Sequence, residues 1–178
     1  MTKLEDGTGG GNWAKVNTDN RLMTIAATEP QIAFRARTGD AYSFTHQYDY
    51  DANDTIIWLA NDSNTKSFVV DRITVASDTA TQYILHFPSG TTPAGTLLDS
   101  VNMNRASGKD ADATAYGDET GNTRGAVYSQ GLLRAGETIV LFVELGLILG
   151  TDDEIAIDFV TAGTSGMATI RGYYLEDL

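Results

Sequence analysis

The sequence contains no cysteine, only two histidines and only three prolines among its 178 residues. Without cysteine the chain forms no disulfide, no thiolate zinc site and no cysteine nucleophile. Scarce proline and eighteen glycines are typical of many strands joined by tight turns. The longest apolar run, Ile139–Leu149, is interrupted by Glu144 and is too short to cross a bilayer. With no secretory signal in the opening residues, we expect a soluble protein made in the cytoplasm.

Positive charge is also scarce, since 12 lysines and arginines face 24 acidic residues and give a net charge of −12. A surface this acidic repels phosphate groups, so we expect neither nucleic acid nor a membrane as a partner. The charge is uneven, because residues 1–40 contain five bases and five acids and residues 41–178 carry the whole excess. A neutral leading segment on an acidic body either docks on another protein or arises by chance.

Sequence patterns for catalysis, cofactors and metals are missing. Only His46 and His86 could act as a general base, and both fall within strand patterns. There is no nucleophile elbow or phosphate-binding loop, and the acidic turns lack the spacing of calcium-binding loops. Glu144 and Asp158 are the best carboxylates for glycoside hydrolysis, but both lie opposite the apolar stripes of their strands. We therefore expect no enzymatic activity, no cofactor and no metal site.

Aromatic side chains could form an exposed platform that binds carbohydrate. The candidates for such a platform are Tyr42, Tyr48, Tyr50, Trp58, Tyr173 and Tyr174. The strand patterns around them instead favour burial in the core or contact between subunits.

Apolar patterning predicts strands over most of the chain. Ala41–Tyr50 alternates with period two, and Thr55–Ala60 is a continuous apolar run, typical of a strand buried on both faces. The strongest signal is Gly136–Ala162, which we interpret as the central hairpin, with a turn at Gly150–Asp153. Further strands are expected at Arg21–Thr28, Phe68–Ala76, Gln82–Phe87, Leu97–Met103 and Met167–Leu175.

Two segments do not follow this pattern: residues 31–40 are ambiguous, and residues 106–125 are expected to form a long surface loop. No segment shows convincing helical periodicity. Eight to ten strands with turns every 8–12 residues, counted from these patterns, predict an all-β, jelly-roll-like antiparallel β-sandwich. We expect this single domain to span residues 13–178, after a flexible, glycine-rich N-terminal arm at residues 1–12.

Several short motifs follow one another in residues 6–75. They are Asp6–Gly11 (DGTGGG), Ala14–Val16 (AKV), Asn20–Leu22 (NRL), Gly39–Tyr42 (GDAY), Ile56–Asn61 and Val69–Ile73 (VVDRI). Their order resembles that of small virion-associated proteins of tailed bacteriophages, in which a glycine-rich arm leads through a basic–apolar strand into an N-R-L segment. The later part of the chain follows that group only in general style.

The resemblance implies a non-enzymatic structural protein that decorates and stabilises the exterior of a capsid and is assembled in the host cytoplasm. Its partners would be copies of itself, with a trimer favoured, and the major capsid protein or another virion protein. The docking arm would span residues 6–22. Its expected contact residues are Gly7, Gly9, Gly10, Gly11, Trp13, Arg21 and Leu22.

Two alternatives remain open at this point. One is a tail or baseplate component, or another β-sandwich module, that binds glycans. The other is a carbohydrate-active enzyme, which needs two carboxylates facing each other across a groove.

Overall fold

The computed structural model describes residues 4–5, 13–14, 30–90, 94–119 and 122–176. The chain divides into two units, Met1–Pro30 and Gln31–Leu178. Within the first unit, the described residues form an antiparallel pair of short strands, β1 (Leu4–Glu5) and β2 (Trp13–Ala14). The second unit contains the helix and the remaining strands.

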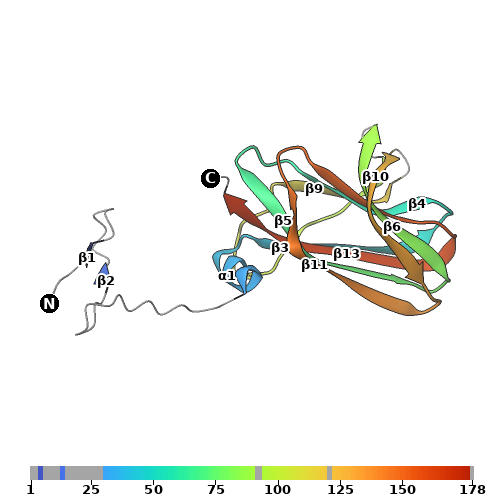
Figure 1. Cartoon of the computed structure of the whole chain (residues 1–178), viewed down its shortest axis with the longest axis horizontal. Coiled ribbons are helices and arrows are strands. Elements are labelled where there is room, and N and C mark those ends of the chain that lie inside the picture. The colour runs from blue at the N-terminus through green and yellow to red at the C-terminus, as the bar shows by residue number, and fades with distance from the viewer. Residues whose placement is uncertain (1–3, 6–12, 15–29, 91–93, 120–121, 177–178) are drawn as a thin grey trace. The chain divides into compact units, whose positions relative to one another are not determined.

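The second unit is an antiparallel β-sandwich, shown in Figure 1, which confirms the all-β expectation. The six-stranded sheet runs in the order β10 (Asn122–Leu133), β6 (Thr81–Gly90), β12 (Glu154–Phe159), β4 (Asp54–Asn61), β9 (Ala113–Glu119), β7 (Thr96–Leu97). The five-stranded sheet runs in the order β11 (Glu137–Leu149), β5 (Lys66–Ser77), β13 (Gly163–Glu176), β3 (Ala41–Tyr50), β8 (Val101–Asn102).

The core lies between the inner faces of the two sheets. Strands β3 and β12 show the expected alternation, since Phe44 and Ile157 point inward and are completely buried. Aromatic rings from strands of the five-stranded sheet pack against one another in the core, with the centroid of Phe68 5.1 Å from that of Tyr174 and 6.1 Å from that of Phe44. Removing this apolar surface from water is the main term that holds the sheets together.

Strand β4 is buried along its whole length, as its continuous apolar run predicts. Its inner side chains join the main core, whereas Trp58 and Ala60 point to the outer face and pack with Ala156 and Tyr116. The indole nitrogen of Trp58 donates to a carboxylate oxygen of Glu154 at 3.1 Å, so the polar edge of the ring is satisfied.

One segment that the sequence left ambiguous is a helix, and two local expectations are wrong. Residues 31–38 form helix α1 (Gln31–Thr38), which has no fully buried residue and therefore lacks a clear apolar stripe in the sequence. The expected loop at residues 106–125 is largely occupied by β9 and by the start of β10. The expected strand at Leu97–Met103 reduces to the two-residue strands β7 and β8.

Gly136–Ala162 is also not a central hairpin. Strand β11 lies at the edge of the five-stranded sheet, whereas β12 lies inside the six-stranded sheet, between β6 and β4. Both strands are apolar on the side that faces the core, so the sequence pattern reports their buried faces correctly but contains no information about which strands they pair with. The expected strand at Arg21–Thr28 lies outside the described residues.

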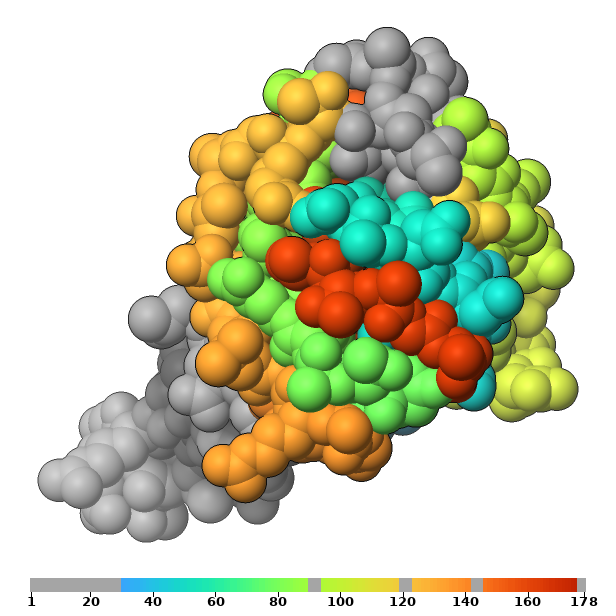
Figure 2. Space-filling view, turned by 90° about the vertical axis from the view of Figure 1, so that its right-hand side faces the viewer, coloured from blue at the N-terminus to red at the C-terminus, as the bar shows by residue number. Residues whose placement is uncertain are grey.

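Hydrogen bonds tie the turns at the two ends of the sandwich. At one end, the side-chain amide of the fully buried Asn61 donates to the carbonyl oxygens of Lys66, Leu149 and Gly150 at 2.9–3.0 Å. Figure 2 looks onto the other end, where segments coloured cyan, green, orange and red meet. There the amide of Asp78 donates to the carbonyl of Ser165 at 3.0 Å.

Candidate functional site

The outer face of the six-stranded sheet carries a row of polar side chains across four neighbouring strands. Oδ1 of Asp158 accepts from Thr55 Oγ1 at 2.7 Å and from His86 Nε2 at 3.0 Å. Oδ2 of Asp158 accepts from Nε and Nη2 of Arg124, each at 2.8 Å. The row therefore links β4, β12, β6 and β10 through one carboxylate.

Asp158 is held as a carboxylate despite its burial. Its side chain is only 5% exposed, and this burial acts to raise its pKa. The hydrogen bond and the charge of His86, followed by the hydrogen bonds from Thr55 and Arg124, outweigh that effect and lower the pKa below its usual value. Such a fully bonded carboxylate stabilises the sheet as long as it stays ionised.

A histidine next to an aspartate also resembles part of a catalytic triad, so its second ring nitrogen decides the interpretation. In a triad that nitrogen faces a nucleophile and a substrate. Here His86 is completely buried, and its Nδ1 has no hydrogen-bond partner among the described residues. Thr55 bonds to the carboxylate rather than to the ring. Because the ring is buried and no substrate reaches it, the arrangement is suited to holding neighbouring strands together.

Acidic side chains line a pocket beside the turns that follow β3 and β12. Asp49, Asp51, Asp54 and Asp118 line this pocket, which has a volume of about 510 Å³. Burial raises the pKa of Asp54, and the charge of Asp118 adds to this, although the hydroxyl of Tyr48 donates to Asp54 Oδ2 at 2.8 Å. Among the described residues, no group of three or more such side chains is arranged to hold a metal ion.

The aromatic residues considered for a glycan platform mostly lie inside the protein. Tyr42, Tyr50, Trp58 and Tyr174 are each between 2% and 5% exposed. Their burial agrees with the core interpretation of the sequence. Of the two carboxylates considered for hydrolysis, Asp158 belongs to the buried row, and the side chain of Glu144 lies outside the described residues.

The two sides of the sandwich differ in the length of their edge strands. We define the closed side by β7 and β8, two strands of two residues each, and the open side by β10 and β11, of 12 and 13 residues. Very short edge strands are a common protection against pairing with other chains, whereas long ones leave backbone donors and acceptors available. In the described part of the chain, β10 and β11 each pair with one strand only.

The open side also presents large apolar side chains to solvent. Leu132 of β10 is 78% exposed, and Val127 and Tyr128 on the same strand are about half exposed. Strand β11 adds Val140 at 40% and Ile148 at 53%. These five residues lie on two separate sheets along the two edges, Leu132 on the outer face of one sheet and Val140 and Ile148 on the outer face of the other.

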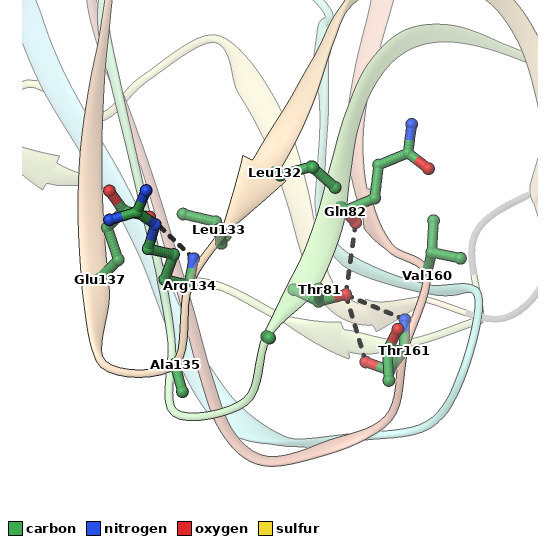
Figure 3. A pocket seen from close by; sticks show the side chains of 10 residues that line it. Thr81, Gln82, Leu132, Leu133, Arg134, Ala135, Glu137, Val160 and Thr161 are labelled. Atoms are coloured by element: carbon green, nitrogen blue, oxygen red, sulfur yellow. Dashed lines mark hydrogen bonds between the residues drawn. The ribbon is translucent and has the colours of Figure 1, made fainter.

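A pocket lies at one end of the open side, shown in Figure 3. It has a volume of about 770 Å³ and is lined by residues 80–82, by residues 132–135 and by Glu137, Val160 and Thr161. Figure 3 shows Leu132 and Leu133 pointing to opposite sides of β10. The backbone amide of Arg134 donates to Glu137 Oε2 at 2.7 Å, which fixes the turn between β10 and β11.

The open side contains one of several acid-free segments of the chain. Residues 122–136 contain no acidic residue and two arginines, Arg124 and Arg134, in a chain of net charge −12. Strand β11 begins with Glu137 and contains Glu144. Arg134 and Glu137 therefore carry opposite charges at the end where the two edges meet, and the acid-free residues 122–136 let an acidic molecule approach another copy.

The contact residues expected in the N-terminal arm lie mostly outside the described residues. These are Gly7, Gly9, Gly10, Gly11, Arg21 and Leu22. Trp13 lies in β2, where its backbone is paired with that of Glu5. The surface on β10 and β11 was missed by sequence reasoning, because the edge position of these strands depends on the order of strands in the sheets.

Comparison with known proteins gives no match to a family model, to a curated protein or to a solved structure. In the described part of the chain, no helix is long and apolar enough to span a membrane.

Proposed function

We propose that this chain is a non-enzymatic structural protein that works as an assembly of identical copies. The single observation that carries the proposal is the contrast between the two sides of the sandwich. The closed side ends in two-residue strands, whereas the open side keeps two edge strands of 12 and 13 residues. A monomer that stays alone in solution normally protects such edges with charges, prolines, bulges or coverings, and residues 129–133 of β10 and 137–142 of β11 contain no bulge.

The location of this assembly follows from the sequence resemblance. We propose that the copies decorate and stabilise the exterior of a bacteriophage capsid and bind the capsid through the arm at residues 6–22. The acidic body, which carries the net charge of −12, keeps such a particle surface soluble and limits non-specific contact with nucleic acid. Glycines in the arm can extend along a neighbouring protein, where their backbone gains order.

The native mass of the purified chain tests self-association. We expect light scattering to give a multiple of the 19.1 kDa mass of one copy. A mass of one copy at every concentration would contradict the proposal.

Deleting residues 1–12 tests the docking arm. We expect the truncated chain to keep its β-rich circular dichroism spectrum and its native mass, but to be lost from purified particles. Incorporation equal to that of the intact chain would rule out a docking role for this segment, while leaving self-association untouched.

A further inference from the structure

We propose that the copies join in a closed ring in which β10 of one copy pairs, antiparallel, with β11 of the next. This inference rests on the proposed self-association and specifies its surface. The occupant of the open side is therefore a second copy of this chain, and both sheets of the sandwich continue from one copy into its neighbours.

Strand direction allows this pairing without any rearrangement. Strands β10 and β11 follow one another through the short connection at residues 134–136, so they run in opposite directions. Suppose that two copies are related by rotation about an axis parallel to their strands. Each strand then keeps its direction, and each residue keeps its position along the axis. The β10 edge of one copy then meets the β11 edge of the next in the antiparallel sense, in which neighbouring strands form perpendicular hydrogen bonds.

The regular parts of the two edges lie at the same end of the sandwich. Strand β10 is irregular between Thr123 and Ala126 and again between Val127 and Ser129, and it is regular over residues 129–133. Strand β11 is regular over residues 137–142, after which its register with β5 shifts before Leu147. Both regular segments adjoin the turn at residues 134–136, so the same rotation places them opposite each other. The irregular parts limit pairing to this region.

Side chains on these segments match in the joined sheet. Leu133 is buried in the core, so its neighbour Leu132 lies on the outer face of the six-stranded sheet. On β11, Ile139 and Leu141 pack against the core, so Thr138 and Val140 lie on the outer face of the five-stranded sheet. In the ring, the outer face of the six-stranded sheet of one copy continues into the outer face of the five-stranded sheet of the next. Leu132 then lies beside Thr138 and Val140 of that next copy.

Charge favours pairing of β10 with β11 over pairing of β10 with β10 or of β11 with β11. In the region where pairing is expected, Arg134 follows β10 and Glu137 begins β11, whereas Arg124 is already paired with Asp158. A contact between two β10 edges brings like positive charges together, and a contact between two β11 edges brings like negative charges together. Pairing β10 with β11 is the only combination of these edges that joins opposite charges.

A matched pair of charge substitutions tests which side of the sandwich is used. Leu132→Lys places a charge on the open side, and Leu97→Lys places the same charge at an exposed leucine of the closed side. Because both positions are more than 60% exposed, both variants should keep the wild-type circular dichroism spectrum. We expect Leu132→Lys to reduce the native mass to that of one copy, and Leu97→Lys to leave it unchanged.

Engineered cysteines test the pairing itself, since the natural chain has none. In Leu132→Cys/Thr138→Cys the two thiols lie on opposite outer faces of one copy, so a short bismaleimide links different copies. We expect covalent oligomers that end at the ring size. Leu132→Cys alone should give almost no product, as should the closed-side control Leu97→Cys/Thr138→Cys.

The outcomes separate this inference from the proposed function. A wild-type chain that stays at 19.1 kDa overturns both. A wild-type oligomer that survives Leu132→Lys, or that dissociates with Leu97→Lys, overturns the ring through β10 and β11 and leaves self-association intact. Efficient cross-linking of Leu132→Cys alone shows β10 pairing with itself and also overturns the inference.

Discussion

Gly117 has no side chain, and the two sheets can pack at their observed separation only because of this. It lies in β9 of the six-stranded sheet, against the imidazole of His46 from β3 of the other sheet. A Cβ at this position would lie 2.2 Å from Cγ of His46, which no real contact allows. Burial lowers the pKa of His46, although the charge of Asp118 opposes this.

We therefore expect Gly117→Ala to lower the free energy of unfolding by about 2 kcal/mol, the usual cost of overpacking a core. The matched control is Gly108→Ala, because no heavy atom lies within 4 Å of a Cβ at that position. Urea unfolding measures both. Equal stabilities of the two variants would contradict the account, and the double variant Gly117→Ala/His46→Ala should lose less than the sum of its parts.

At the scale of single residues, the sequence predicts which face of a strand a side chain lies on, but not which residues of other strands it contacts. The alternation in β3 places His46 on the apolar face, and the structure confirms that placement. The need for glycine at position 117 depends on a side chain of another sheet, far away along the chain. A single sequence contains no signal for that contact.

At the scale of elements, the polar row joins four strands and ties the edge strand β10 to the interior of its sheet. We expect Asp158→Asn to lower the free energy of unfolding by about 2 kcal/mol at pH 7, because the completely buried His86 and the partly exposed Arg124 lose the carboxylate to which they are bonded. The lowered pKa means that the unfolded chain binds the proton more tightly than the folded chain.

The same row predicts a pH dependence with a definite sign. The contribution of Asp158 is fully present above the unfolded pKa of about 4 and is lost as the pH falls through the lower folded value. The test is a series of urea titrations between pH 5 and pH 2, a range of about three units around that pKa. As the pH falls, the free energy of unfolding should decrease less steeply in Asp158→Asn than in the wild type. Asp54→Asn should show the opposite change, since the folded pKa of Asp54 is raised. Identical slopes in all three proteins would contradict the account.

Strands with a clear apolar pattern could be predicted, and elements without one could not. Thr55–Ala60 and Ala41–Tyr50 are strands as expected, because burial on both faces or on one face leaves a direct trace in the sequence. Helix α1 has no buried face, and β9 and β10 are formed largely from small and polar residues. The edge position of β11 depends on the order of the strands, which hydrophobicity does not encode.

At the scale of the whole molecule, charge and edges together determine how copies can meet. The net charge of −12 makes most contacts between copies repulsive. The length of the edge strands β10 and β11 separates the open side from the closed side, and it is the open side that we propose for contact between copies. Sequence reasoning placed the partner surface in the N-terminal arm, and the proposed surface on β10 and β11 is a second one, on the body of the protein.

The central claim is that the chain associates with itself, and its most direct test is the native mass measured by light scattering over a dilution series. The account predicts two or three times 19.1 kDa, constant over the series until dilution dissociates the ring. A ring closes at a fixed size, so the mass should not increase with concentration beyond that value. A mass of 19.1 kDa at every concentration, or one that grows without limit, would contradict the account.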